Sequence, residues 1–170
     1  MKDAGTRRSS LLGWLGFTMA LTGGCNCGQV RYRLALEVLP GTYACHCHQC
    51  QRWSGSAFSQ SAFIPEDSIA ISGPVVCFER EIGAAGAIQT QRVCGACHSR
   101  IYNTTTTRPG VAAIRAGTLD RSDEVECVAH IFTAYRQGWF AIPEGVASWP
   151  EGPSAEGFQA LIRGERPKPS

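Results

Sequence analysis

The chain has 170 residues, which is enough for one domain with a hydrophobic core of its own. Its 16 basic and 14 acidic residues give a net charge of +2, and the basic residues are scattered rather than clustered. This distribution excludes the basic patch of a nucleic-acid-binding protein, so we expect no nucleic-acid partner. The 19 glycines and 9 prolines indicate many turns, which favours short strands over long helices.

The N-terminal residues resemble a targeting signal. Arg7 and Arg8 precede an apolar run over 11–21, but this run is too short to span a bilayer, and no convincing cleavage site follows it. We therefore favour Met19 as the true start and residues 1–18 as an extension outside the domain. A secretory or twin-arginine signal is the alternative interpretation.

Alternating apolar residues predict the first strand over 29–36, with Tyr32 and Leu34 on its buried face. After Cys50 we expect a loop or a single helical turn, and residues 103–108 are predicted to form a polar loop. One short helix is predicted over 155–163, followed by a solvated tail from Gly164. Further strands are expected at 57–64, 69–71, 75–81, 88–93, 111–116 and 128–133. The sequence therefore predicts an all-β fold.

Seven of the nine cysteines fall into three closely spaced groups. An odd number of cysteines leaves a thiol over in any fully paired disulfide framework, and C-x-C neighbours are strained as disulfide partners. Thiolates that bind zinc in a reducing cytosol explain the pattern better than disulfides do, so we expect a cytoplasmic protein.

Two of these groups have the spacing of a structural zinc site. Cys25 and Cys27 form a C-x-C pair, and Cys94 and Cys97 form a C-x-x-C pair. A closed tetrahedral site commonly takes two such pairs from separate hairpins. We predict that these four cysteines bind one zinc ion, which would link the first strand to the middle of the sheet.

The third group supplies only three thiols, from Cys45, Cys47 and Cys50. Three protein ligands with an open position are typical of a reactive zinc site, so we predict a second zinc that is open or labile. Two alternatives remain: the thiols are free, or a histidine closes a second structural tetrahedron. The histidines that this second alternative would use are His46, His48, His98 and His130.

The other candidate residues are interpreted as structural. Cys77 and Cys127 lie alone in apolar strands, so both are predicted to be small buried side chains. His98 is expected at the surface. His130 alternates with apolar neighbours and is expected to be a hydrogen-bonded core residue rather than a catalyst.

The cysteine groups and their neighbours resemble one known family. Residues 22–32, 45–58 and 92–100 are similar to the opening, the central motif and the C-x-x-C segment of the glutathione-dependent formaldehyde-activating enzyme family, which includes centromere protein V. The likeness continues through 114–120 and 130–140, so that it covers about 21–145. We accordingly expect a zinc-binding domain over 19–145 and a C-terminal extension and tail over 146–170.

The resemblance implies an Mss4-like fold of antiparallel sheets held together by zinc. It also implies a structural zinc on Cys25, Cys27, Cys94 and Cys97, and a second zinc on Cys45, Cys47 and Cys50 as the catalytic site. The implied activity is that of a carbon–sulfur lyase, the condensation of formaldehyde with glutathione. Glutathione would then be the co-substrate, and the partners would be a small-molecule thiol and an electrophile, without a membrane.

The carboxylates of glutathione make arginines candidate ligands for this co-substrate. Arg52 and Arg115 are the first choices, with Arg92 and Arg100 also considered, although each alone could be a solvated or structural arginine. The competing hypothesis is a non-catalytic zinc module that carries a thiol ligand or binds a protein.

Overall fold

The computed structural model describes residues 21–38, 40–83 and 86–169. The extension expected at 1–18 and the start expected at Met19 therefore lie outside the described residues. Most secondary-structure elements of the described chain are strands. No described helix is long and apolar enough to cross a membrane. The strands are β1 (Leu21–Gly24), β2 (Arg31–Leu34), β3 (Thr42–Cys45), β4 (Ser59–Pro65), β5 (Ile69–Ser72), β6 (Val75–Ile82), β7 (Ala87–Cys94), β8 (Arg100–Thr105), β9 (Val111–Arg115), β10 (Cys127–Ile131) and β11 (Ala147–Ser148).

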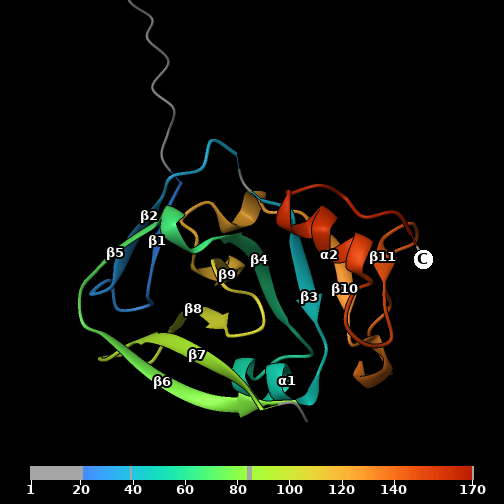
Figure 1. The fold of residues 1–170 in the computed structure, drawn as a ribbon, viewed down its shortest axis with the longest axis horizontal. Coiled ribbons are helices and arrows are strands. Elements are labelled where there is room, and N and C mark those ends of the chain that lie inside the picture. Colours follow the sequence, from blue (N-terminus) through green and yellow to red (C-terminus); the bar gives the residue numbers. More distant parts are fainter. Residues whose placement is uncertain (1–20, 39, 84–85, 170) are drawn as a thin grey trace, which may run out of the picture.

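The strands form two sheets. The smaller sheet is antiparallel with the order β1-β2-β5, and the larger has the order β11-β10-β3-β4-β9-β8-β7-β6. Strand β10 runs parallel to both of its neighbours, β3 and β11, whereas the other described pairs are antiparallel. Figure 1 shows the small sheet at one side of the molecule and helix α2 (Ala155–Ile162) at the other. The predicted all-β, Mss4-like class is confirmed, with two parallel pairings added.

The alternation of side chains along β4 separates two cores. Ala62 and Ile64 point into the core that the two sheets share, where they meet apolar residues such as Leu34. Phe63 points to the opposite face and belongs to a second cluster with Leu161 of α2. Successive strand residues face opposite sides of a sheet. The face of the large sheet that carries Phe63, which we call the second face, is therefore directed toward α2.

Two helices flank the second face. Helix α1 (His48–Ser54) begins at Cys47, whose Sγ accepts a hydrogen bond from the backbone N–H of Cys50, and it ends at Gly55 with a positive φ of 64°. Helix α2 begins at Ser154, whose hydroxyl accepts from the N–H of Gly157 at 3.1 Å. The four 3-10 turns of the described chain are η1 (Glu66–Ser68), η2 (Ala116–Thr118), η3 (Ser122–Glu124) and η4 (Thr133–Tyr135).

Five strands and helices differ from the sequence prediction. Strands β1, β3 and β11 were not expected. Helix α1 has two turns where a loop or a single turn was predicted, and β8 extends into the residues predicted as a polar loop. Asn103 and Thr105 of β8 are 6% and 7% exposed, so this strand buries polar side chains. A polar strand of this kind lacks the hydrophobic alternation on which the prediction relied.

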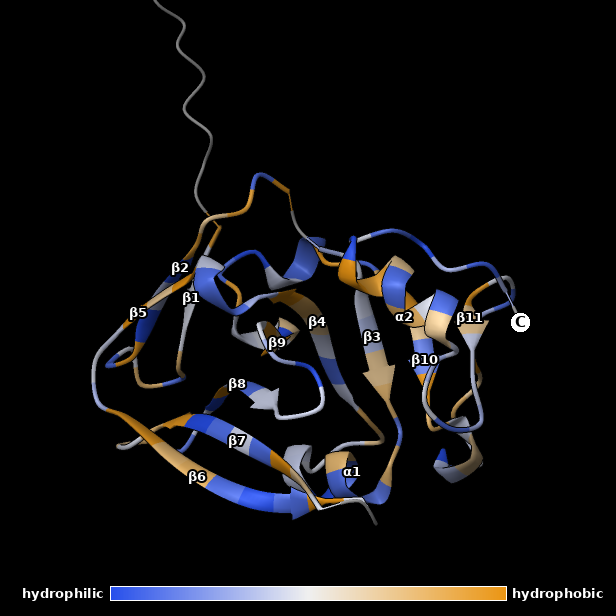
Figure 2. Ribbon diagram, in the orientation of Figure 1, coloured by the Kyte–Doolittle hydropathy of each residue, from blue (hydrophilic) through white to orange (hydrophobic). Residues whose placement is uncertain are grey.

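The prediction that Cys77 is buried is wrong. This cysteine is exposed because β6 is the edge strand of the large sheet, and most of its first half is solvent-accessible. Figure 2 shows that this half of β6 is hydrophobic although it lies at the edge, and that the second half is hydrophilic. Cys127 is half-buried, and burial raises the pKa of its thiol.

Candidate metal centres and the adjoining cavity

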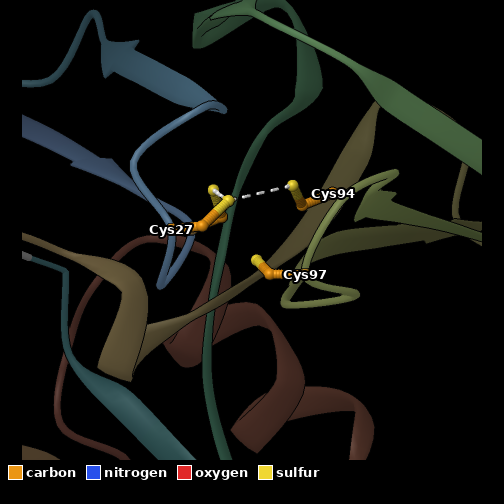
Figure 3. Close-up of side chains that lie close together, drawn as sticks. Cys27, Cys94 and Cys97 are labelled. Carbon is orange, nitrogen blue, oxygen red and sulfur yellow. Dashed lines mark hydrogen bonds between the residues drawn. The ribbon is translucent and has the colours of Figure 1, made fainter.

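The first candidate centre joins the two sheets. Cys25 and Cys27 lie in the turn after β1, Cys94 ends β7, and Cys97 follows in the turn before β8. The four Sγ atoms all lie within 4.8 Å of one another. Figure 3 shows Cys27, Cys94 and Cys97 directed toward one another from the ends of their elements. The four residues of the predicted structural site are therefore brought together.

The donor set of this first centre fits a zinc ion. Zinc–sulfur bonds of about 2.3 Å in a tetrahedron place the sulfur atoms roughly 3.8 Å apart. The Sγ atoms of Cys25 and Cys27 are 3.4 Å apart, and those of Cys27 and Cys94 are 3.8 Å apart. The backbone N–H of Val30 also donates to Cys25 Sγ at 3.2 Å, which stabilises a thiolate at this position.

The second candidate centre is built from one short segment. Cys45 ends β3, Cys47 precedes α1 as its N-cap, and Cys50 lies in the first turn of the helix. Their Sγ atoms lie within 4.8 Å of one another, and no histidine or carboxylate of the described chain joins the group. The three thiols thus have the ligand number of an open zinc site.

None of the histidines that could have closed this second centre joins it in the described chain. His46 is fully buried, and its Nε2 lies 2.9 Å from Nδ1 of His130. Burial lowers the pKa of His130 to about 4, with His46 contributing, and burial also lowers the pKa of His46. His48 packs against the ring of Tyr135, and His98 is exposed, as expected. His130 is a buried, hydrogen-bonded core residue, which confirms its structural interpretation.

A cavity of about 650 Å³ opens beside the second centre. Its wall includes all three thiols of that centre and Trp53 of α1. Tyr43 and Cys45 of β3 are the register partners of Ser61 and Ser59 of β4. These side chains therefore project from the same face of the sheet. Further lining residues from the sheet are Phe63, Gln89, Asn103, Thr105, Ala113 and Ile131. The larger part of the cavity wall is therefore the second face of the eight-stranded sheet.

Arg115, a first-choice candidate ligand for glutathione, lies in the cavity wall. It ends β9, and its guanidinium donates to Ser61 Oγ at 2.6 Å and to Asn103 Oδ1. Its Nε is buried without a hydrogen-bond partner. Burial lowers the pKa of the Arg115 guanidinium, but arginine remains protonated in proteins.

Arg100 also lines the cavity. Its guanidinium carbon lies 4.1 Å from the ring centroid of Trp53, and burial together with Arg115 lowers its pKa to about 9.

The other two candidate arginines lie outside the cavity wall. Arg52 is exposed on α1 and does not line the cavity. Arg92 forms an ion pair with Glu66 at 3.1 Å and stacks on Tyr102, which gives it a structural role.

Sequence reasoning missed two arginines of the cavity. Arg80 lies 4.6 Å from the Trp53 centroid and donates to Gln89 at 2.9 Å. Arg108 lies 5.3 Å from the centroid of Phe63 and 5.1 Å from that of Phe158. Neither belongs to a recognisable motif, and only the register of β6 with β7 would have directed attention to Arg80.

These features define an all-β protein with two cysteine clusters that could hold metal ions, one between its sheets and one on a cavity wall. The sequence model of the glutathione-dependent formaldehyde-activating enzyme family matches residues 20–135, and the chain belongs to this family.

Comparison with individual proteins adds little to the family assignment. No curated protein sequence matches the chain. One of the solved structures that match is the crystal structure of a Rhodobacter sphaeroides protein, a structural genomics target, with 17% sequence identity and a TM-score of 0.46. That match covers 62% of this chain and 97% of the other.

Proposed function

We propose that the protein is a zinc-dependent enzyme of the carbon–sulfur lyase type that joins glutathione, or another thiol, to a small electrophile such as formaldehyde. The observation that carries this proposal is the group of three thiols, without a fourth described ligand, on the wall of a large cavity. A purely structural site would be closed by a fourth protein ligand.

Cys45, Cys47 and Cys50 would hold the second zinc. When bound there, zinc would supply a cation that favours the thiolate form of an incoming thiol, whose free pKa is about 8.5. Three cysteine thiolates leave such a site with a net negative charge, so the main contribution of the protein is to orient the reactants. Arg80 and Arg100 on the cavity wall offer guanidinium groups for the carboxylates of glutathione.

The chemical step needs no further reactant. The sulfur attacks the carbonyl carbon, a carbon–sulfur bond forms, and the C=O π bond breaks. The proton of the thiol is transferred to the carbonyl oxygen, which becomes the hydroxyl of the adduct.

Calorimetric titration of reduced glutathione into the zinc-loaded protein tests this proposal. We expect saturable binding that is lost in Cys47→Ser, while circular dichroism shows that this variant remains folded. Cys77→Ser is the matched control, because Cys77 is exposed on β6 and outside both clusters. Absence of binding in a protein with both zinc ions would contradict the proposal.

A non-catalytic zinc module is the second candidate. It is favoured by the exposed aromatic side chains near the second centre: Trp139 is 74% exposed and Tyr135 is 45% exposed. Tyr135 packs on His48, beside the cysteines, so a protein partner at this surface would contact the centre. If Cys47→Ser loses zinc but retains every activity of the protein, the module is the better description. A cytoplasmic location and the absence of a nucleic-acid partner remain predictions.

A further inference from the structure

The cavity contains more positive charge than its own residues neutralise. Among the described residues, four arginines line it, and none of its lining residues is an aspartate or glutamate. None of the four is among the ion pairs of the described chain, whereas Arg31, Arg92, Arg121, Arg163 and Arg166 each pair with a carboxylate. Charges that are partly removed from water are normally paired, because their desolvation is costly. The three thiolates with a bound zinc would carry a net charge of about −1, which offsets only part of the charge of the four arginines. The remaining positive charge indicates an anionic ligand.

One of these four cations lies beside the three thiols. Ser59 is the register partner of Cys45, so both side chains project from the same face of neighbouring strands. The Arg115 Nη1 atom lies 3.4 Å from Ser59 Oγ and 2.6 Å from Ser61 Oγ. The Arg115 guanidinium is thus placed next to the strand end that carries Cys45, with one buried N–H still unpaired.

Glutathione alone accounts poorly for a cation at this position. In glutathione a whole glycyl unit separates the sulfur from one carboxylate, and a longer γ-glutamyl unit separates it from the other. Arg80, Arg100 and Arg108 on the cavity wall are available for these two carboxylates. This leaves Arg115 for an anion on the second substrate.

We propose, building on the thiol-addition function above, that the electrophile is a small 2-oxo acid whose carboxylate pairs with Arg115. In such a molecule the carboxylate is bonded directly to the carbonyl carbon that the sulfur attacks. The carbon–sulfur bond forms as the C=O π bond breaks, and the thiol proton moves to the former carbonyl oxygen. The product is a 2-hydroxy-2-thio acid, whose carboxylate remains on the Arg115 guanidinium.

Two measurements on the zinc-loaded protein test this inference. The first compares glyoxylate with formaldehyde, each with glutathione, by carbon-13 NMR above the uncatalysed rate. We expect kcat/KM to be at least about tenfold higher for glyoxylate, as a charge-assisted hydrogen bond would give. The second is a calorimetric titration with oxamate, a 2-oxo acid analogue that lacks a reactive carbonyl.

Oxamate binding is measured in wild type, Arg115→Gln, Arg115→Lys and the control Arg33→Gln, which alters an exposed arginine of the small sheet. We expect binding to weaken at least about tenfold in Arg115→Gln, to recover partly in Arg115→Lys and to be unchanged in Arg33→Gln. The glyoxylate comparison needs only wild type, so the inference stays testable if Arg115→Gln does not fold.

The outcomes separate the inference from the function on which it rests. If glutathione binds and formaldehyde reacts at least as well as glyoxylate, the inference is wrong and the proposed function stands. Equal oxamate affinity in wild type and folded Arg115→Gln would also overturn the inference. If glutathione does not bind and neither aldehyde reacts, the proposed function is wrong and the inference fails with it.

Discussion

The Sγ atoms of Cys27 and Cys94 lie 3.8 Å apart, although 67 residues separate the two cysteines in the sequence. The first cysteine lies in the turn between β1 and β2 of the small sheet, and the second ends β7 of the large one. A metal ion held by both would join the two sheets, and its binding energy would contribute directly to folding.

Cys94→Ser should therefore prevent stable folding. The whole domain is expected to be stable by only about 5–15 kcal/mol, and structural zinc sites contribute energies of this order. Circular dichroism melting and zinc analysis would show an unfolded chain without the first zinc. Cys77→Ser should melt like wild type. A Cys94→Ser protein that melts cooperatively at the wild-type temperature would contradict the assignment of a structural site.

Cys50→Ser should have a different effect, because its cluster lies within residues 45–50 and joins no distant elements. We expect a folded protein that retains one zinc per chain and an unchanged near-ultraviolet spectrum. The measurement is metal content after dialysis, with wild type dialysed in parallel. Loss of both zinc ions from a folded Cys50→Ser protein would show that the two centres are not independent.

The His46–His130 contact predicts a pH dependence of stability. Burial holds the pKa of His130 near 4 in the folded protein, below its value of about 6.5 in the unfolded chain. Between these values the unfolded chain binds a proton that the folded protein does not, so the free energy of unfolding falls as the pH is lowered through this window.

Urea denaturation of wild type and His130→Asn, across about pH 7 to pH 5 and at matched zinc content, would measure this effect. Wild type should lose stability relative to the variant as the pH falls. His98→Asn, which alters an exposed histidine, should follow wild type. A difference between wild type and His130→Asn that stays constant with pH would contradict the neutral buried pair.

Gly23 lies where the small sheet approaches η2, the turn that follows β9. A Cβ atom at this position would come within 2.3 Å of the Thr118 carbonyl oxygen and within 2.2 Å of the Tyr32 hydroxyl. Because one of these atoms belongs to the backbone, we expect Gly23→Ala to destabilise the protein by about 1–3 kcal/mol. Thermal melting would measure this cost. Gly138→Ala is the control, since a Cβ there meets nothing within 4 Å, and an equal effect of both changes would count against the close contact.

Local pattern predicted most of the strands, because one of their faces is apolar. The alternation of Val30, Tyr32 and Leu34 places these side chains in the core between the sheets, as expected. The grouping of the seven cysteines was likewise predictable, since thiols at metal-binding spacing must converge in space. These features depend on residues close together in the sequence or on a chemical need that the residues share.

The cavity could not be predicted in the same way, because part of its wall consists of polar strand residues, which lack an apolar alternation. The polar sequence around Asn103 and Thr105 predicts a loop. Both residues nevertheless belong to a strand whose polar side chains face Arg115 and the cavity. Neither Arg80 nor Arg108 belongs to a sequence motif, and only the folded chain brings them to the cavity wall. Arg52 is a candidate because glutathione carries carboxylates, but α1 carries its side chain to the exposed surface.

Arg108 rests on Phe158, which lies in α2, beyond the residues that the family model matches. Gly152 and Pro153, also beyond that match, form part of the cavity wall. The cysteines that define the family and the C-terminal segment that completes the cavity thus lie in separate parts of the chain. Relatives can therefore inherit the same metal ligands while diverging in ligand preference, and a protein cut at the limit of the family match would lose part of the surface on which its selectivity depends.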